Sequence, residues 1–335
     1  MKIERKINMS RSSKQNLILL ALLVIAILFF ASQNPLFLTT YNLTGIVRQN
    51  LPEIIIACAM MFVIASGAID LSVGGVMALS AIVYGHLCLM GVNPWLAILV
   101  VIPLGMFIGF LNSFIFQRLG IPAIMATMAT WLITSSLALT LVRAIPISEP
   151  EVRYITVLNR MRFFNNLIPL AVFIVLAIVL IFLFLEKKTL LGKYAIAIGG
   201  NSQATELSGI NVWRVRMIFF MLCSTMAATA GVWQVARMGS ADPKIGVGTE
   251  FSVISACILG GVNIKGGSGT VTGVLIGSCL LFVLTNGMRM MGINTFYQQV
   301  VVGIVLLSAV LINSIVDMKS MKRKPALMKE VASKS

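Results

Sequence analysis

Residues 186–216 read EKKTLLGKYAIAIGGNSQATELSGINVWRVR and form the longest polar, basic interruption in the middle of an otherwise apolar chain. Within this segment, Asn201 or Ser202 is placed to cap a short helix. Residues Gln203–Ser208 would form that helix, and Gly209 would end it in a left-handed turn. A helix this short is not stable alone in water. The central segment therefore predicts a partner that holds it.

The composition of the chain is that of a membrane protein. Of its 335 residues, 58% are hydrophobic and only 11% are charged, whereas a soluble domain has about 25% charged residues. The net charge of +15 comes from Lys and Arg in tails and loops between apolar runs. There these residues set membrane orientation, so we expect a lipid bilayer as partner and no nucleic acid.

The apolar residues form ten predicted membrane spans. Several are short for a bilayer about 30 Å thick, so some spans are expected to be broken or re-entrant. The predicted spans are Leu17–Ala31, Leu51–Ser66, Val73–Met90, Pro94–Phe116, Pro122–Val142, Leu167–Leu185, Val215–Val235, Phe251–Val262, Thr270–Met288 and Phe296–Ile315.

The distribution of cations predicts the orientation of these spans. If the N-terminus lies in the cytoplasm and the spans alternate, 18 of the 26 Lys and Arg residues lie inside and the other 8 outside. This bias follows the positive-inside rule. We therefore expect an all-α polytopic bundle with both termini in the cytoplasm.

The domain organisation follows from these spans. We expect a basic cytoplasmic N-tail at residues 1–16, one transmembrane domain at 17–316 with a cytoplasmic loop at 186–214, and a basic C-tail at 317–335. The longest outside loop, Arg143–Asn166, would form a small extracytoplasmic cap. The central segment separates two groups of five spans, which permits an inverted repeat.

Several classes of chemistry are disfavoured by residues that the chain lacks. Only Glu53 and Asp70 among the eleven carboxylates are predicted to approach the membrane, whereas ion-coupled transporters keep acidic groups in their bundles. The sequence contains neither a phosphate-binding G-x-x-x-x-G-K-[ST] loop nor a G-x-S-x-G elbow. His86 is the only histidine, and the five cysteines lie in apolar runs without a CxxC pair. We therefore expect no catalytic residue, metal site or cofactor in this chain, which leaves a channel or a bundle driven by a docked motor.

Three glycine-containing stretches carry a recognisable pattern. The first is Ser66–Gly74, the second runs from Gly192 to Val212, and the third is Gly260–Gly269. In this order and spacing they resemble the permease subunits of bacterial ABC sugar importers of the ribose/xylose/arabinose type. The resemblance extends from about Leu17 to Asn313, with Ala68 replacing a glycine that many relatives have.

This resemblance implies a fold, a set of partners and a coupling element. The fold would be that of a type II ABC importer, with a second permease copy or a paralogue as its dimer partner. An ABC ATPase carrying ATP and Mg would dock on the cytoplasmic side, and a periplasmic sugar-binding protein would deliver substrate. The ATPase-coupling loop would use Gly192, Asn201, Ala204, Glu206, Leu207, Gly209 and Ile210. The alternative is an ordinary solvated loop.

The first and third motifs predict structural pivots. Asp70 is placed to cap the helix that follows it, with help from Ser72, at the cytoplasmic mouth of the bundle; substrate contact by Asp70 is the alternative. Gly269, Gly273 and Gly277 predict a face on which two helices pack closely. The predicted gating and structural residues are Gly67, Asp70, Ser72, Gly74, Gly261, Gly266, Gly267 and Gly269.

A sugar pathway requires amide, hydroxyl and aromatic side chains. Within the spans, the candidates are Asn112, Thr127, Thr130, Trp131, Asn286 and Gln298. Hydrogen bonding between helices is the alternative role for each of them.

Together these features predict a multi-pass permease of the bacterial inner membrane that imports a monosaccharide or small polyol by alternating access. One alternative is import of a nucleoside or furanosyl signal molecule by the same architecture. A second is a stand-alone facilitator or channel, and a third is an intramembrane enzyme dependent on His86.

Overall fold

The computed structural model describes residues 11–308 and residue 311. This part is helical except for a two-residue antiparallel hairpin, β1 (Arg162–Phe163) and β2 (Ile168–Pro169). The helices are α1 (Arg11–Gln33), α2 (Thr40–Ala65), α3 (Val73–Leu89), α4 (Pro94–Arg118), α5 (Ala123–Leu141), α6 (Pro150–Arg153), α7 (Thr156–Arg160), α8 (Leu170–Lys188), α9 (Leu190–Gly200), α10 (Ser202–Leu207), α11 (Val212–Met238), α12 (Thr249–Leu259) and α13 (Val271–Met290). A further apolar helix covers Thr295–Ser308.

Each of the ten predicted spans corresponds to an apolar helix. Within the described residues, seven helices are long and apolar enough to cross a membrane. The other three, α3, α12 and Thr295–Ser308, are shorter. The all-α polytopic fold is therefore confirmed, including the expectation that some spans are incomplete. The predicted C-tail at 317–335 and most of the N-tail at 1–16 lie outside the described residues.

The start of α2 and the structure of the central segment differ most from the prediction. Helix α2 begins at Thr40 rather than Leu51, with the hydroxyl of Thr39 accepting a hydrogen bond from the Asn42 amide. Its first turns are polar, so hydropathy alone did not reveal them. The central segment also contains α9, which buries Ala195 and Ile198 on one face. Much of the predicted loop is therefore helix.

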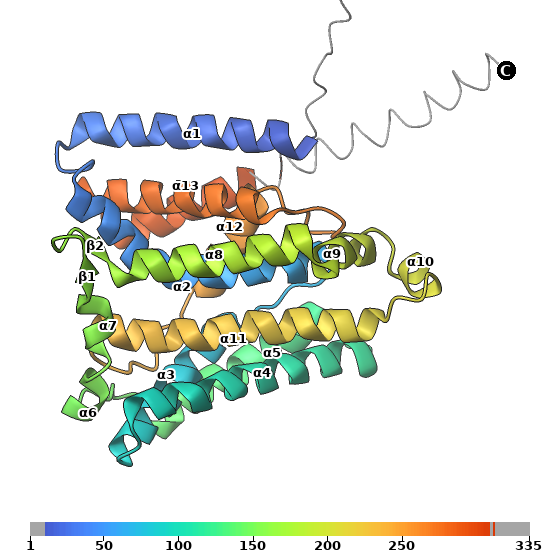
Figure 1. Ribbon diagram of the computed structural model, residues 1–335, viewed down its shortest axis with the longest axis horizontal. Helices are drawn as coiled ribbons and strands as arrows, with labels where there is room; N and C mark the ends of the chain where they lie inside the picture. The colour runs from blue at the N-terminus through green and yellow to red at the C-terminus, as the bar shows by residue number, and fades with distance from the viewer. Residues whose placement is uncertain (1–10, 309–310, 312–335) are drawn as a thin grey trace, which may run out of the picture.

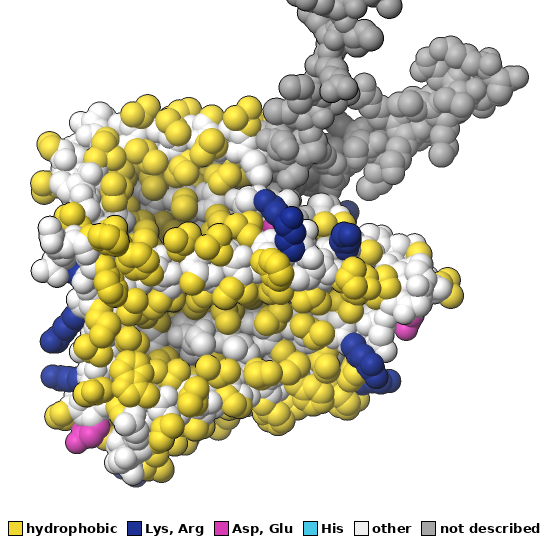
Figure 2. All heavy atoms as spheres, viewed as in Figure 1, with side chains coloured by type: hydrophobic (Ala, Val, Ile, Leu, Met, Phe, Trp, Pro, Cys, Tyr) yellow, Lys and Arg dark blue, Asp and Glu magenta, His cyan; other side chains and the backbone are white. Residues whose placement is uncertain are grey.

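The two ends of the bundle carry different elements. Helices α9 and α10 lie at one end, whereas α6, α7 and the β-hairpin lie at the other (Figure 1). Lys and Arg side chains gather at these ends, and the surface between them is largely apolar (Figure 2). The central segment and the predicted extracytoplasmic cap therefore lie on opposite sides of an apolar belt.

Helices α2 and α11 are antiparallel neighbours at the centre. Near the start of α11, the Arg216 guanidinium donates to the Ser66 carbonyl just after α2, with Nη2 at 2.9 Å. Near its end, Trp233 Nε1 donates to the Arg48 carbonyl at 3.3 Å. Each long helix leads into a non-helical segment and then a short helix, α3 after α2 and α12 after α11. The two units run in opposite directions, as an inverted repeat requires.

Both short helices begin inside the bundle. Along α11, Arg216 contacts Ser66, Ser224 contacts Asp70, and Gly231 lies against Met77 of α3. Since a helix rises 1.5 Å per residue, Ser224 lies about 18 Å from the start of α11. Residues 66–72 therefore enter the bundle from the α9–α10 end, and α3 starts at mid-depth.

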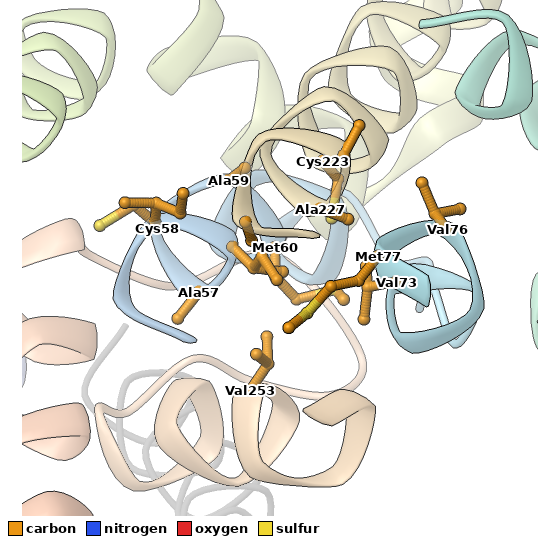
Figure 3. Packing of buried hydrophobic residues seen from close by; sticks show 14 of the residues in the cluster. Ala57, Cys58, Ala59, Met60, Val73, Val76, Met77, Cys223, Ala227 and Val253 are labelled. Carbon is orange, nitrogen blue, oxygen red and sulfur yellow. The ribbon is translucent and has the colours of Figure 1, made fainter. Parts of the chain in front are cut away.

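The second non-helical segment, residues 239–248, enters from the opposite end. Ala241 lies beside Gly85 near the end of α3, whereas Gly246 packs on Gly74 near its start. The N-termini of α3 and α12 therefore meet in the middle. Helices α2, α3, α11 and α12 share one apolar core around Met60, Met77, Cys223 and Val253 (Figure 3).

Candidate functional site: a glycine junction beneath two half-helices

Helix α10 projects from the end of the bundle (Figure 1). The Asn201 side chain caps it by accepting a hydrogen bond from the Ala204 amide at 3.0 Å. Gly209, at φ +85°, follows it in the left-handed conformation. The Leu207 side chain is 90% exposed, and its burial by a partner would contribute about 1.5–3 kcal/mol. The short helix thus forms as predicted, and it presents an apolar side chain that the other described residues leave exposed.

The predicted coupling residues divide into two groups. Asn201, Ala204, Glu206, Leu207 and Gly209 are exposed on or beside α10, and Ile210 is half-buried. Gly192 is different, because it is buried in α9 and a Cβ there would overlap the Glu186 carbonyl. Its position allows α9 to fold back against the end of α8.

The end of α9 is in backbone contact with the two glycine turns of the bundle. A Cβ on Gly199 would overlap the Ala65 carbonyl, the Gly267 amide and Gly266 Cα. Gly266 in turn lies against Gly67, since a Cβ added at Gly266 would be only 2.8 Å from the Gly67 amide nitrogen. The Gly267 amide donates to the Ala65 carbonyl at 2.9 Å. We call Gly67, Gly199, Gly266 and Gly267 the glycine junction.

The glycine junction brings together one residue or more from each of the three sequence motifs. Gly67, Gly266 and Gly267 have φ values of +84°, +84° and +80°, a region that only glycine adopts without strain. Arg216 supports the junction from α11 through its hydrogen bonds to the Ser66 carbonyl. Displacement of α9 must therefore move the turns that lead into α3 and α13.

Above the junction, Asp70 is the acceptor at the centre of a buried hydrogen-bond network. Its Oδ1 accepts from the Ser72 amide at 2.9 Å and from Ser72 Oγ at 2.6 Å. Asn112 Nδ2 donates to Ser72 Oγ at 2.8 Å, and Ser224 Oγ donates to Asp70 Oδ2 at 3.5 Å. Asp70 thus links α3, α4 and α11. It is fully buried at mid-depth, deeper than the predicted position at the cytoplasmic mouth.

A further carboxylate lies beside this network. Glu250, in the first turn of α12, is 3% exposed, and its Oε2 has no hydrogen-bond partner among the described residues. A Cβ on Gly74 would overlap this oxygen and the Gly246 carbonyl. The prediction that only Glu53 and Asp70 approach the membrane was therefore wrong. Glu250 looked extramembrane because the segment before α12 is polar and glycine-rich.

Both buried acids lie at helix N-termini. Asp70 precedes α3, and Glu250 begins α12. The positive end of a helix dipole stabilises an anion at this position. The two half-helices therefore place two acidic side chains in the middle of the bundle.

The remaining predicted glycines have packing roles. Gly261, at φ +83°, follows α12. Gly269 lies before α13, where a Cβ would touch Val262 at 3.1 Å. Within α13, Gly273 and Gly277 let the helix approach the Gly260 backbone at the end of α12. These contacts hold α12 and α13 together.

The six candidate pathway residues do not form one lining. Asn112, Thr127, Thr130 and Trp131 lie on α4 and α5. Asn112 Nδ2 donates to Ser72 Oγ and Thr127 Oγ1 accepts from the Leu71 amide at 3.1 Å, and the Trp131 backbone lies against Gly75 of α3. Asn286 on α13 instead donates to Asn42 Oδ1 at 3.0 Å, and Gln298 donates to the Ile293 carbonyl at 2.8 Å. The structure thus groups four candidates and separates two.

Sequence reasoning missed Gly199, Arg216, Ser224 and Glu250 as parts of the site. Gly199 stood in a motif, and Arg216 ended the central segment, so their spacing offered a weak signal. Ser224 and Glu250 are recognised only through contacts distant in sequence. Among the described residues, no group of three His, Cys, Asp or Glu side chains is arranged to hold a metal ion.

Comparison with known proteins places this architecture in a family. Residues 42–310 match the family model described as "Branched-chain amino acid transport system / permease component". The chain belongs to this family. The protein is thus a multi-pass membrane permease, and the glycine junction, the half-helices and the projecting α10 are features of that permease.

Several relatives of the permease are named as sugar transport proteins. It is 34% identical over 297 residues to the ribose import permease protein RbsC of Escherichia coli (strain K12), covering 88% of this chain and 92% of that protein. RbsC of Bacillus subtilis (strain 168) is 36% identical over 292 residues (87% and 90%). The L-arabinose transport system permease protein AraH of E. coli (strain K12) is 33% identical over 292 residues (87% and 88%). No solved structure matches the permease.

Proposed function

We propose that the permease forms the membrane pathway of an ATP-driven importer for a monosaccharide or similar small polyol in the bacterial inner membrane. An ABC ATPase binds at α10 and hydrolyses ATP, a periplasmic binding protein delivers the sugar at the opposite end, and a second permease copy or a paralogue completes the pathway. The similarity to ribose and arabinose permeases supports the substrate class.

The observation that carries the mechanism is the continuous backbone path from α10 to the half-helices. Helix α10 is exposed, and α9 directly precedes it in the chain. Gly199 at the end of α9 touches the turns at Gly67 and Gly266. Closure of an ATPase dimer would push α10, and α9 would transmit the displacement to the segment 66–72. That segment carries Asp70, so the motion reaches the centre of the bundle.

Alternating access follows if the two half-helices are the moving parts. They meet at the middle of the bundle and lead to opposite ends. Small rotations of tightly packed helices about glycine contacts change which end is open without breaking the long helices α2 and α11. The four grouped candidates Asn112, Thr127, Thr130 and Trp131 would contact the passing sugar.

Reconstitution tests this function. Liposomes that contain the permease with its cognate ATPase and binding protein should accumulate radiolabelled ribose or arabinose only when ATP is supplied on the ATPase side. Uptake by the permease alone would show a facilitator and refute the proposal. Uptake of a nucleoside but neither pentose would refute the substrate class alone.

A charge reversal tests the docking site. Glu206→Lys on α10 should abolish retention of the ATPase during purification, whereas Glu151→Lys, an equally exposed acid on α6 at the other end, should not. Equal retention by both variants would place the ATPase elsewhere on the permease.

A further inference from the structure

Two adjacent hollows at the α6–α7 end have opposite chemical character. A polar pocket of about 420 Å³ is lined by Arg153, Thr156, Asn159 and Arg160 near α7 and by Arg237 and Ser240 near the end of α11. An apolar cavity of about 250 Å³ is lined by residues of α2, α4, α7, α8 and α11, including Ile98, Ile155, Ile174, Ile178 and Trp233.

Helix α7 and the end of α11 form the wall between the two hollows. Ile155 and Leu158 face the apolar cavity, whereas Thr156, Asn159 and Arg160 face the polar pocket. On α11, Val232 and Trp233 line the cavity, and the next turn lines the pocket. The two hollows are therefore about one helical turn apart along the bundle axis, with the polar one nearer the end.

The charge of the polar pocket is unbalanced. Three arginines line it, and no acidic residue is among its described lining residues. The Glu53 carboxylate interacts electrostatically with Arg237 from outside the lining, which leaves the charges of Arg153 and Arg160 without a described acidic neighbour in the pocket. Arg237 donates to Gln234 Oε1 at 2.6 Å, which leaves its other guanidinium hydrogens available. The Asn159 Oδ1 atom is buried and accepts no hydrogen bond from the part of the chain that the structure describes. The pocket thus suits an anionic group that also carries a hydrogen-bond donor.

The surrounding surface marks the level of the membrane interface. Trp95 and Tyr154 are exposed beside the pocket, with ring centroids 6.4 Å apart. Exposed Trp and Tyr side chains collect at the boundary between lipid headgroups and hydrocarbon. The cavity lies toward the apolar belt, where Phe173, Leu176 and Leu180 of α8 are also exposed.

We propose that an anionic phospholipid binds here, with its phosphate at Arg153, Arg160 and Arg237 and one acyl chain in the apolar cavity between α8 and α11. A phospholipid is the ligand whose charged and apolar parts follow one another in the order of the two hollows. The bound chain fills space between α8 and α11 that α7 bridges only at one end, so the lipid adds to the direct packing of α8 on α2.

Native mass spectrometry of the purified permease tests this site, with phosphatidylglycerol and phosphatidylcholine of the same acyl chains as probes. We expect phosphatidylglycerol to bind more tightly. The double variant Arg153→Gln/Arg160→Gln should weaken phosphatidylglycerol binding about 25-fold, since each cation at an anionic surface contributes roughly fivefold. Arg143→Gln, an exposed cation of the same loop outside the pocket, is the matched control.

A second pair of variants tests the apolar cavity. Ile178→Trp places a large side chain in the cavity and should prevent binding of both lipids, whereas Leu180→Trp, on the exposed side of the same helix, should leave binding unchanged. Thermal unfolding and gel filtration of each variant establish that it is folded.

Three results would overturn the proposal. They are equal binding of the two lipids to the unaltered permease, undiminished phosphatidylglycerol binding by the folded double arginine variant, and full lipid binding by folded Ile178→Trp. If the double arginine variant loses an acidic partner protein but keeps phosphatidylglycerol, the pocket is a protein-docking site and the lipid assignment is wrong.

Discussion

The half-helices α3 and α12 have equivalent positions but differ in how completely their acids are hydrogen-bonded. Asp70 before α3 accepts three hydrogen bonds, from the amide and hydroxyl of Ser72 and from Ser224. Glu250 in α12 leaves Oε2 without a partner among the described residues. The segment before α12 also contains Gly239 and Gly248 at φ values of +71° and +82°.

This difference indicates one half whose local packing is locked and one half whose local packing can rearrange. A buried acceptor with several partners locks the elements that donate to it. A buried oxygen without a partner is costly, and the cost is relieved when the local structure rearranges. We therefore infer that α3 moves as a rigid arm together with its hydrogen-bond partners, and that α12 is the arm whose own packing rearranges during transport.

The contact between the two arms should be the least tolerant of added volume. In Gly74→Ala the new methyl group would overlap the Glu250 carboxylate and the Gly246 carbonyl. We expect a loss of about 3 kcal/mol or more, because overpacking against backbone relaxes poorly. Thermal unfolding and gel filtration in detergent measure it. Gly45→Ala, where a Cβ meets nothing within 4 Å, is the control, and equal stability of the two variants would show that the arms are not packed together.

Removal of the Asp70 carboxylate tests the rigid arm. Asp70→Ala leaves the Ser72 and Ser224 donors buried without an acceptor, so we expect a loss of about 2–3 kcal/mol. The midpoint of thermal unfolding should fall, and the expressed amount should decrease. A variant of normal stability that specifically loses sugar transport would instead assign Asp70 to the substrate pathway.

Gly199→Ala tests whether the glycine junction connects α10 to the rigid arm. The methyl group would overlap three backbone atoms at the junction, which we expect to cost about 2 kcal/mol and to separate ATP hydrolysis from uptake. Gly200→Ala is the matched control on the next residue, where a Cβ meets nothing within 4 Å. Uptake per ATP hydrolysed is the measurement. Normal coupling in Gly199→Ala would mean that force reaches the bundle by another route.

The smallest effect is expected at Glu250. Glu250→Gln replaces an acid at a helix N-terminus, where a negative charge is worth about 1 kcal/mol, and breaks no hydrogen bond that Oε2 makes with another described residue. The midpoint of thermal unfolding should change little. The rate of uptake should change, because the substitution alters the equilibrium between the arrangements that α12 and its surroundings adopt. A fall in stability as large as that of Asp70→Ala would erase the distinction between the arms.

The sequence predicted the helices better than their depth. Continuous apolar runs identified all ten spans, because a membrane helix is apolar both where it packs on other helices and where it faces lipid. Depth was not readable, since the apolar run of α3 looks the same whether it begins at the surface or at mid-bundle. The first turns of α2 were missed because they contain polar residues such as Asn42 and Arg48, which a search for apolar runs does not detect.

Local chemistry was more predictable than long-range contact. Asn201 and Gly209 determine α10 through hydrogen bonds and dihedral angles within a few residues, and its form was foreseen. The meeting of Gly67, Gly199 and Gly266 depends on packing between distant segments, which no local pattern encodes. Asn286 and Gln298 are amide side chains in predicted spans, as Asn112 is. Yet Asn286 bonds to Asn42 and Gln298 to the Ile293 carbonyl, away from Asn112.

Helix α1 has a separate small core. Leu19, Ala26, Phe30 and Phe37 cluster with residues of α13 rather than with the central helices, and the Phe30 ring lies over Gly287. Each transmembrane helix is independently stable in lipid once its backbone hydrogen bonds are formed. Because α13 follows α1 by more than 200 residues, α1 is synthesised long before its packing partner. We therefore expect the contact between α1 and α13 to form late in the assembly of the permease.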